Sequence, residues 1–88
     1  MSPQERQQAI YATLQAKLQP TSLEVIDESY QHVGHKGHGG AGHFAVRIVA
    51  PCFTDKSLVA QHRLVYAALN DLMGTEIHAL RIDSKALD

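Results

Sequence analysis

The sequence predicts an α+β fold: a two-layer αββαβ domain whose three-stranded mixed sheet carries both helices on one face. Two segments place apolar residues at helical spacing, and three short segments alternate residues as strands do. Their order is helix, strand, strand, helix, strand, so the second helix connects the last two strands. Such a crossover is right-handed and makes the strands that it joins parallel. All 88 residues suit a single domain, 1–88.

The first helix has sequence signals at both ends. Ser2, Pro3 and Glu5 are suited to the N-cap, the first helical position and the acidic position of a capping box. Pro20 is expected to stop the helix. Between these limits, apolar residues recur every four positions and form one stripe: Ile10, Leu14 and Leu18.

The first two strands are predicted at Leu23–Asp27 and His43–Val49, and Pro51 ends the second. They can pair antiparallel across the segment that separates them. Alternation in the second strand puts three large apolar side chains on one face: Phe44, Val46 and Ile48.

The second helix is expected to begin with Thr54 or Asp55 as its cap and to run to about Met73. Gly74 is a good residue for the position just after its end. Its buried face is predicted from the helical spacing of apolar residues, and His62 falls on the same face as a hydrogen-bonded core histidine: Leu58, His62, Val65, Leu69 and Leu72.

Glu76–Ile82 is predicted to be the third strand, followed by a short polar tail at Asp83–Asp88. The core made by these elements should fold without a metal ion, unlike that of a zinc finger. Its predicted members are Ile10, Leu14, Val25, Phe44, Val46, Val65, Leu69, Leu80 and Ile82.

Composition narrows the class of protein. A net charge of −1 argues against nucleic-acid binding, because proteins that bind nucleic acids usually present a basic face. A single cysteine, Cys52, excludes an internal disulfide and fits a reducing compartment, where it would serve as a small apolar residue. No apolar run approaches the roughly 20 residues of a membrane span, and the polar N-terminus has no signal-peptide pattern. We therefore expect a cytoplasmic chain, or one in an equivalent reducing space if a transit peptide is removed, and we expect it to be monomeric when alone.

Histidines and glycines are concentrated in one segment, Gln31–Gly42, which contains five of the six glycines and three of the six histidines. Imidazoles are the commonest protein ligands of metal ions. The loop histidines are His32, His35 and His38, and such a tract by itself is only a compositional signal. A ligand on a rigid strand would make a better site, and His78 in the third strand is the candidate.

Several segments together resemble one known family, the BolA family, in order from about Leu23 to Ile82. The most specific of them are the HRLVY run in the second helix and the HAL run in the third strand. The matching segments are Asp27-Glu28-Ser29-Tyr30-Gln31-His32, His43-Phe44, Phe53-Thr54, Gln61-His62-Arg63-Leu64-Val65-Tyr66 and Ile77-His78-Ala79-Leu80.

The resemblance implies the αββαβ fold, which is similar to the type II KH fold, and binding to a monothiol glutaredoxin. In this family the heterodimer holds a [2Fe-2S] cluster, to which the glutaredoxin side brings its cysteine and a glutathione thiolate. The BolA side brings the histidine of the third strand and a His or Cys of the loop. These correspond here to His78 and, by position, to His32. His35, His38 and, less directly, His43 are the other candidates, and the isolated apo chain should hold no cofactor.

A second function is open, because some BolA members are described as DNA-binding regulators. The residues that would then contact nucleic acid belong to the long second helix: Lys56 and Arg63. A near-zero net charge argues against strong binding. In the first function Arg63 would instead meet the protein partner, since its planar guanidinium suits interfaces. No nucleophile–base pair or phosphate-binding loop occurs in the sequence, so we do not predict an enzyme.

Overall fold

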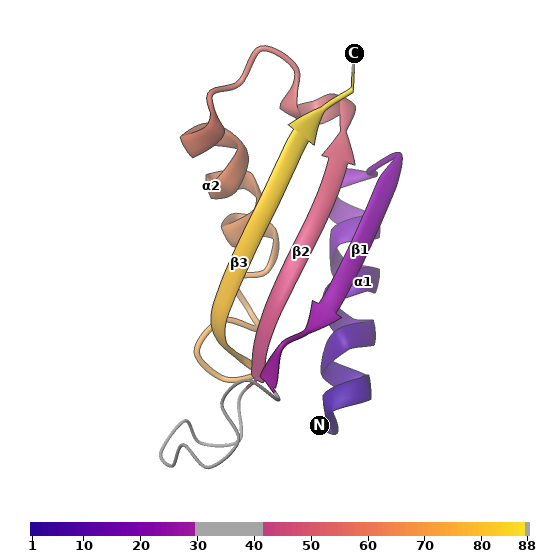
Figure 1. Cartoon of the computed structure of the whole chain (residues 1–88), viewed down its shortest axis with the longest axis vertical. Coiled ribbons are helices and arrows are strands. Elements are labelled where there is room, and N and C mark those ends of the chain that lie inside the picture. The colour runs from indigo at the N-terminus through magenta and orange to yellow at the C-terminus, as the bar shows by residue number, and fades with distance from the viewer. Residues whose placement is uncertain (30–41, 88) are drawn as a thin grey trace.

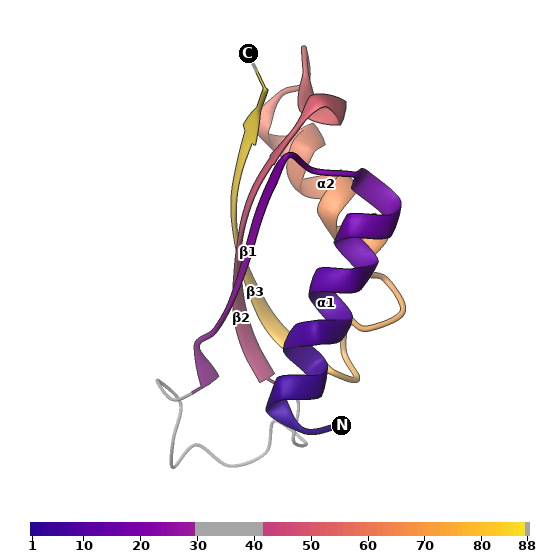
Figure 2. The same ribbon diagram turned by 90° about the vertical axis from the view of Figure 1, so that its right-hand side faces the viewer.

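A computed structural model describes residues 1–29 and 42–87, and it arranges them in two layers (Figure 1). The elements are α1 (Pro3–Leu18), β1 (Ser22–Asp27), β2 (Gly42–Ala50), the 3-10 turn η2 (Pro51–Phe53), α2 (Leu58–Ala68) and β3 (Ile77–Ala86). The sheet order is β1-β2-β3, with β1 and β2 antiparallel and β2 and β3 parallel. Both helices cover the same face of the sheet (Figure 2). The predicted fold class is confirmed.

The α1 helix begins as the sequence predicts. Ser2 Oγ accepts a hydrogen bond from the Glu5 backbone N–H at 3.1 Å, and the Glu5 carboxylate accepts one from the Ser2 N–H at 2.9 Å. The hydrogen bond from the Ser2 backbone, followed by the one from its side chain, lowers the pKa of Glu5. At the other end, Gln19 has the left-handed φ of 49° and turns the chain toward Pro20.

The core lies between the sheet and the two helices. Seven of its nine predicted members are buried, and Leu80 and Ile82 are partly buried on the same face. The core cluster also includes five residues that are absent from the predicted list: Ile48, Ala50, Phe53, Ala68 and Ile77. No helix in the described ranges has the length and apolar character needed to cross a membrane.

The predicted start of the second helix is wrong. Pro51–Phe53 forms a 3-10 turn, and Asp55 has a φ of 61°, which interrupts any helix at that residue. Ser57 is the actual cap, because its Oγ accepts a hydrogen bond from the Ala60 N–H at 3.1 Å. As the first residue of a helix that starts later, Leu58 is 59% exposed rather than buried.

The predicted end of the same helix is also wrong, because α2 stops at Ala68 and not at Met73. The chain then turns, with the N–H groups of both Leu72 and Met73 donating to the Leu69 carbonyl. Gly74 has a φ of 85°, as expected for a left-handed residue, but its N–H donates to the Ile77 carbonyl. It therefore leads the chain into β3 instead of ending a helix.

The third strand begins one residue later than predicted and is longer, because the expected polar tail continues the ladder to Ala86. Asp83 and Lys85 are exposed on the open face of the sheet, while Ser84 points toward the helices. Ser84 Oγ donates a hydrogen bond to Gln61 Oε1 at 2.7 Å, and the Gln61 amide donates to the Lys56 carbonyl at 3.0 Å. Gln61 is only 8% exposed, so this polar link ties α2 to the end of β3.

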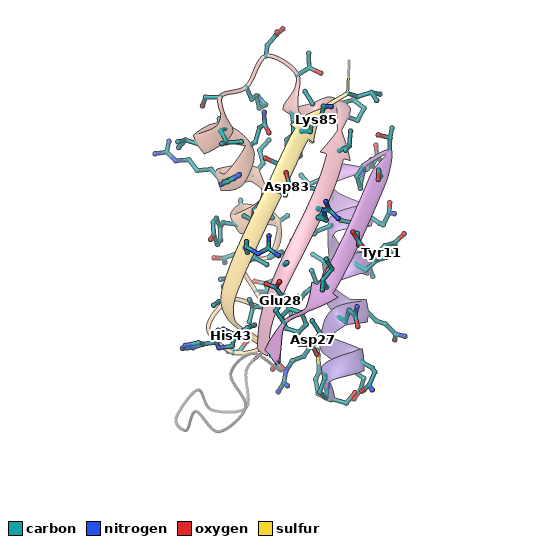
Figure 3. All side chains as sticks on the ribbon, viewed as in Figure 1. Tyr11, Asp27, Glu28, His43, Asp83 and Lys85 are labelled. Atoms are coloured by element: carbon teal, nitrogen blue, oxygen red, sulfur yellow. The ribbon has the colours of Figure 1, made fainter. Side chains whose placement is uncertain are left out.

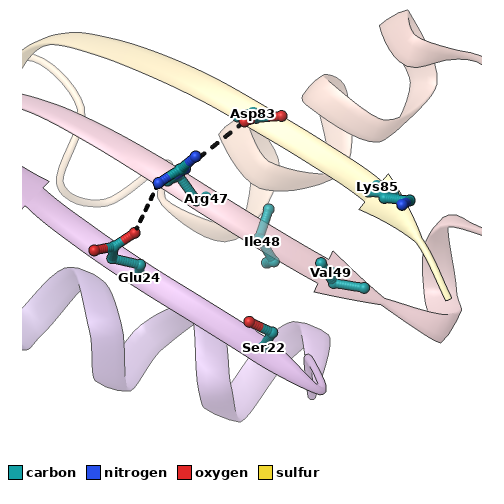
Figure 4. A pocket seen from close by; sticks show the side chains of 7 residues that line it. All are labelled: Ser22, Glu24, Arg47, Ile48, Val49, Asp83 and Lys85. Carbon is teal, nitrogen blue, oxygen red and sulfur yellow. Dashed lines mark hydrogen bonds and ion pairs between the residues drawn. The ribbon is translucent and has the colours of Figure 1, made fainter.

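Two ion pairs in very different surroundings allow a matched stability test. Arg6 Nε lies 3.0 Å from Glu76 Oε1, with side chains 15% and 25% exposed. On the open face of the sheet, Arg47 lies 3.4 Å from Glu24 and 3.8 Å from Asp83, and all three side chains are about 60% exposed (Figure 4).

We expect Arg6→Met to lower the free energy of unfolding by about 2 kcal/mol, because it leaves a half-buried carboxylate without its partner. Arg47→Met is the control and should change the free energy by less than about 0.5 kcal/mol, since solvent screens an exposed pair. Urea unfolding followed by circular dichroism measures both. Equal losses in the two variants would contradict the assignment of the Arg6–Glu76 pair as a structural link.

A candidate metal-ligand site at one end of the sheet

The structure brings two histidines of neighbouring strands together. His43 is the second residue of β2 and His78 is the second residue of β3. Their ring centroids are 5.0 Å apart, with the ring planes inclined by 55°. His78 is exposed and His43 is partly exposed, so the pair faces the open side of the sheet.

A β-bulge places His78 in this position. Gly42 pairs with Ile77, but the next residue, His43, pairs with Ala79, so β3 has one extra residue at this point. The burial pattern shows the same shift: Ile77 is buried, His78 and Ala79 are both exposed, and Leu80 returns to the core side. Bulges commonly redirect a side chain near a functional site. Here the extra residue turns the imidazole of His78 toward that of His43.

The backbone of His43 is held from the β1 side by two residues that follow that strand. Its N–H donates to Ser29 Oγ at 3.0 Å, and its carbonyl accepts from the Glu28 N–H at 2.7 Å. Ser29 is fixed in turn, because its own N–H donates to Asp27 Oδ1 at 2.8 Å. Asp27, Glu28 and His43 lie together at this end of the sheet (Figure 3).

An ion pair crosses the sheet beside the histidines. Arg81 Nη2 lies 2.7 Å from Glu28 Oε2, so the pair reaches from β3 to the residue after β1. The hydrogen bond to the Glu28 carboxylate, and then its negative charge, raise the pKa of Arg81. A shallow depression next to His43 is lined by Glu28, His43, Phe44, Ala79, Leu80 and Arg81.

The other predicted site residues lie elsewhere. Lys56 is exposed in the turn before α2, and Arg63 is exposed on α2 itself. Cys52 is partly buried in η2. His62 was expected to be a hydrogen-bonded core histidine; it is partly buried, and its Nε2 makes no hydrogen bond within residues 1–29 and 42–87. The loop histidines fall outside the described residues: His32, His35 and His38.

The described residues supply two imidazoles but not a complete metal site. Within those ranges, no group of three or more His, Cys, Asp or Glu side chains is placed to hold a metal ion. Two imidazoles on one tetrahedral ion, with metal–nitrogen distances near 2.0–2.1 Å, would have ring centroids about 5 Å apart. The centroid distance of 5.0 Å between His43 and His78 is therefore compatible with two nitrogen ligands of a single metal, whose other ligands would have to come from elsewhere.

Comparisons with known proteins agree with this arrangement of elements. A sequence model of the family described as BolA-like protein matches residues 14–88. SufE-like protein 1 of Arabidopsis thaliana is 46% identical over 78 residues, which cover 82% of this chain and 21% of that protein. The DNA-binding transcriptional regulator BolA of Escherichia coli is 39% identical over 69 residues, covering 78% of this chain and 64% of the regulator.

A solved structure extends the likeness to the fold. The BolA domain of SufE1 from Arabidopsis thaliana has a TM-score of 0.80 and 46% sequence identity, over 92% of this chain and 91% of that domain. The chain thus spans less than two thirds of both full-length relatives but nearly all of the solved domain.

Proposed function

The chain belongs to the BolA-like protein family, and on this premise we propose that it binds a monothiol glutaredoxin and shares a [2Fe-2S] cluster with it. The observation that carries the proposal is the pairing of His43 and His78, with ring centroids 5.0 Å apart on the open side of the sheet. The pair would meet the ligands of a partner at this exposed edge of the domain. The function would be iron–sulfur cluster trafficking or sensing, performed by binding and not by catalysis.

His78 is proposed as the first ligand on this chain. It is exposed at a bulge, where a side chain can reach a partner without disturbing the core. An imidazole binds iron only in its neutral form, so bound iron keeps the nitrogen deprotonated. With cysteine and glutathione thiolates on the partner side, such a cluster has mixed nitrogen and sulfur ligands, as in Rieske centres, which raises its reduction potential.

The second ligand on this chain is proposed to be an imidazole close to His78. His43 is supported by its position beside His78, and its backbone is held by Glu28 and Ser29. His32 is supported by its place in the family pattern, and His35 and His38 belong to the same segment. We favour His43, because a ligand already held at the right distance loses little conformational freedom when it binds.

The compartment and the partner surface complete the proposal. A lone cysteine suits a reducing space such as the cytoplasm, and the chain alone would be a monomer without a cluster. Arg63 is exposed on α2, one helical turn after the exposed apolar side chain of Val59. An exposed arginine with apolar neighbours is a composition favoured at protein interfaces, so we propose that Arg63 contacts the glutaredoxin.

Anaerobic reconstitution with a monothiol glutaredoxin, glutathione, iron and sulfide tests the function. Visible circular dichroism should show a cluster whose spectrum differs from that of the glutaredoxin alone. We expect His43→Ala to shorten the lifetime of the cluster against a chelator more than the triple change of His32, His35 and His38 to alanine. A larger effect of the triple change would transfer the second ligand to the loop, and no shared cluster with the unmodified chain would refute the function.

DNA binding is the second candidate function. It is favoured by the named E. coli relative and by the exposure of Lys56 and Arg63 near and on one helix. Neutralising phosphates makes DNA affinity fall steeply with salt, in proportion to the number of contacts. A salt titration of binding to duplex DNA separates the two functions, because cluster sharing with glutaredoxin does not require any DNA affinity.

A further inference from the structure

We infer that Ser29 is the positioning residue of the histidine pair, because it holds His43 beside His78. The ladder between β1 and β2 ends with the pair Asp27 and Phe44, so His43 lies just beyond the last pair of that ladder. Residues at the end of a strand separate easily unless other contacts hold them. Ser29 Oγ supplies such a contact by accepting the His43 N–H at 3.0 Å, and the same oxygen lies 3.5 Å from the His43 carbonyl.

The serine is itself held in place by its neighbours. Its N–H donates to Asp27 Oδ1 at 2.8 Å, two residues back, as in the local turns that Asp side chains form. Glu28, which lies between Asp27 and Ser29 in the sequence, donates its N–H to the His43 carbonyl. Its carboxylate forms an ion pair with Arg81. Two groups of the Asp-Glu-Ser triplet therefore hold the His43 backbone directly, the Glu28 N–H and the Ser29 hydroxyl, while the Asp27 carboxylate holds Ser29 in place.

The absence of a side chain at Gly42 leaves space for the contacts of Glu28 and Ser29 with His43. A Cβ atom at this position would lie 2.5 Å from Phe44 Cε2 and 3.1 Å from Ser29 Oγ. The Gly42 N–H also donates to the Glu76 carbonyl at 3.0 Å, which fixes the start of β2 against the start of β3. Only a residue without a side chain lets the serine, the phenylalanine ring and the strand start pack this closely.

The contacts from Glu28 and Ser29 hold the backbone of His43, and the position of that backbone determines where the imidazole lies. His78 is oriented by the bulge in β3, so the separation of the two rings also depends on the position of the His43 backbone near the start of β2. Residues that orient metal ligands from outside the ligand set commonly change metal affinity 10- to 100-fold when they are replaced. The inference rests on the proposed function only in treating His43 as a ligand; the positioning itself is a property of the free chain.

The first experiment uses the isolated chain and needs no cluster. In Ser29→Ala, we expect faster amide exchange at His43 and a weaker nuclear Overhauser effect between the ring protons of His43 and His78. Ser29→Thr keeps the hydroxyl and should restore both. Ser84→Ala is the matched control, because it removes another hydrogen-bonded hydroxyl, 2.7 Å from Gln61, away from the histidines. Unchanged exchange and ring contact in Ser29→Ala would overturn the inference, whatever the cluster does.

The second experiment asks whether Ser29 acts through His43. In the complex with glutaredoxin, Ser29→Ala should speed cluster loss to a chelator by about tenfold, and by much less in a His43→Ala background. Equal effects in both backgrounds would show that the serine does not act through His43 and would overturn the inference. If the unmodified chain forms no cluster, the proposed function fails, and the amide exchange and ring contact of the free chain still decide the role of Ser29.

Discussion

Replacing His78 with alanine is expected to abolish stable cluster sharing while leaving the fold intact. The side chain is exposed at a bulge, so its removal opens no cavity and should change the free energy of unfolding by less than about 0.5 kcal/mol. Loss of a direct ligand should exceed the 10- to 100-fold effects of residues that only orient ligands. The measurement is the rate of cluster loss to a chelator at fixed pH, in the complex with glutaredoxin and glutathione.

Two companion variants sharpen this test. Asp83→Ala removes another exposed side chain from the open face of β3 and should leave the rate unchanged. His78→Cys offers a thiolate in place of the imidazole and should retain a cluster with an altered visible spectrum. An unchanged spectrum and lifetime in His78→Ala would remove His78 from the ligand set and leave His43 and the loop histidines as candidates.

Replacing Phe44 with alanine should be the most damaging single change to stability among those considered. The side chain is 2% exposed, lies in the core cluster between the sheet and helices, and contacts the start of β2 at Gly42. Truncation of a buried phenylalanine costs about 3–5 kcal/mol, from lost transfer free energy and the cavity that remains. Small domains have a total stability of only about 5–15 kcal/mol, so this single change would remove a large fraction of it.

Urea unfolding followed by far-ultraviolet circular dichroism measures this loss. Val59→Ala is the control, since Val59 is 60% exposed on α2 and its truncation should change the free energy by less than about 0.5 kcal/mol. The slope of free energy against urea should stay the same in both variants if the unfolded state is unchanged. A Phe44→Ala variant as stable as Val59→Ala would mean that this ring does not contribute to the core.

Local patterns were sufficient for most of the fold. Ser2 and Glu5 cap α1 as expected, and the alternation in β2 correctly puts Phe44 and Val46 in the core. The errors at α2 arise where backbone conformation, not composition, decides. Asp55 has a positive φ and Ser57 forms the cap three residues after Thr54, yet all three residue types are good caps in sequence.

The proximity of His43 to His78 could not be predicted from local patterns, for a similar reason. The strand pattern and the family pattern single out His78 as a candidate ligand, whereas neither pattern places His43 ahead of the loop histidines. Which residues stand opposite each other across two parallel strands depends on register, and register depends on the whole packed domain. One local signal was present: Ile77 and Leu80 are separated by two residues instead of one, which indicates a bulge in an otherwise alternating strand.

The extra residue in β3 indicates that the stability of this strand and its function place opposite demands on its length. A chain shortened by one residue between Ile77 and Leu80 would keep both on the core side and gain an uninterrupted ladder. Only one outward position would then remain where His78 and Ala79 now stand. Selection for a robust fold alone would favour the shorter strand, so length variants at this place would trade activity for stability.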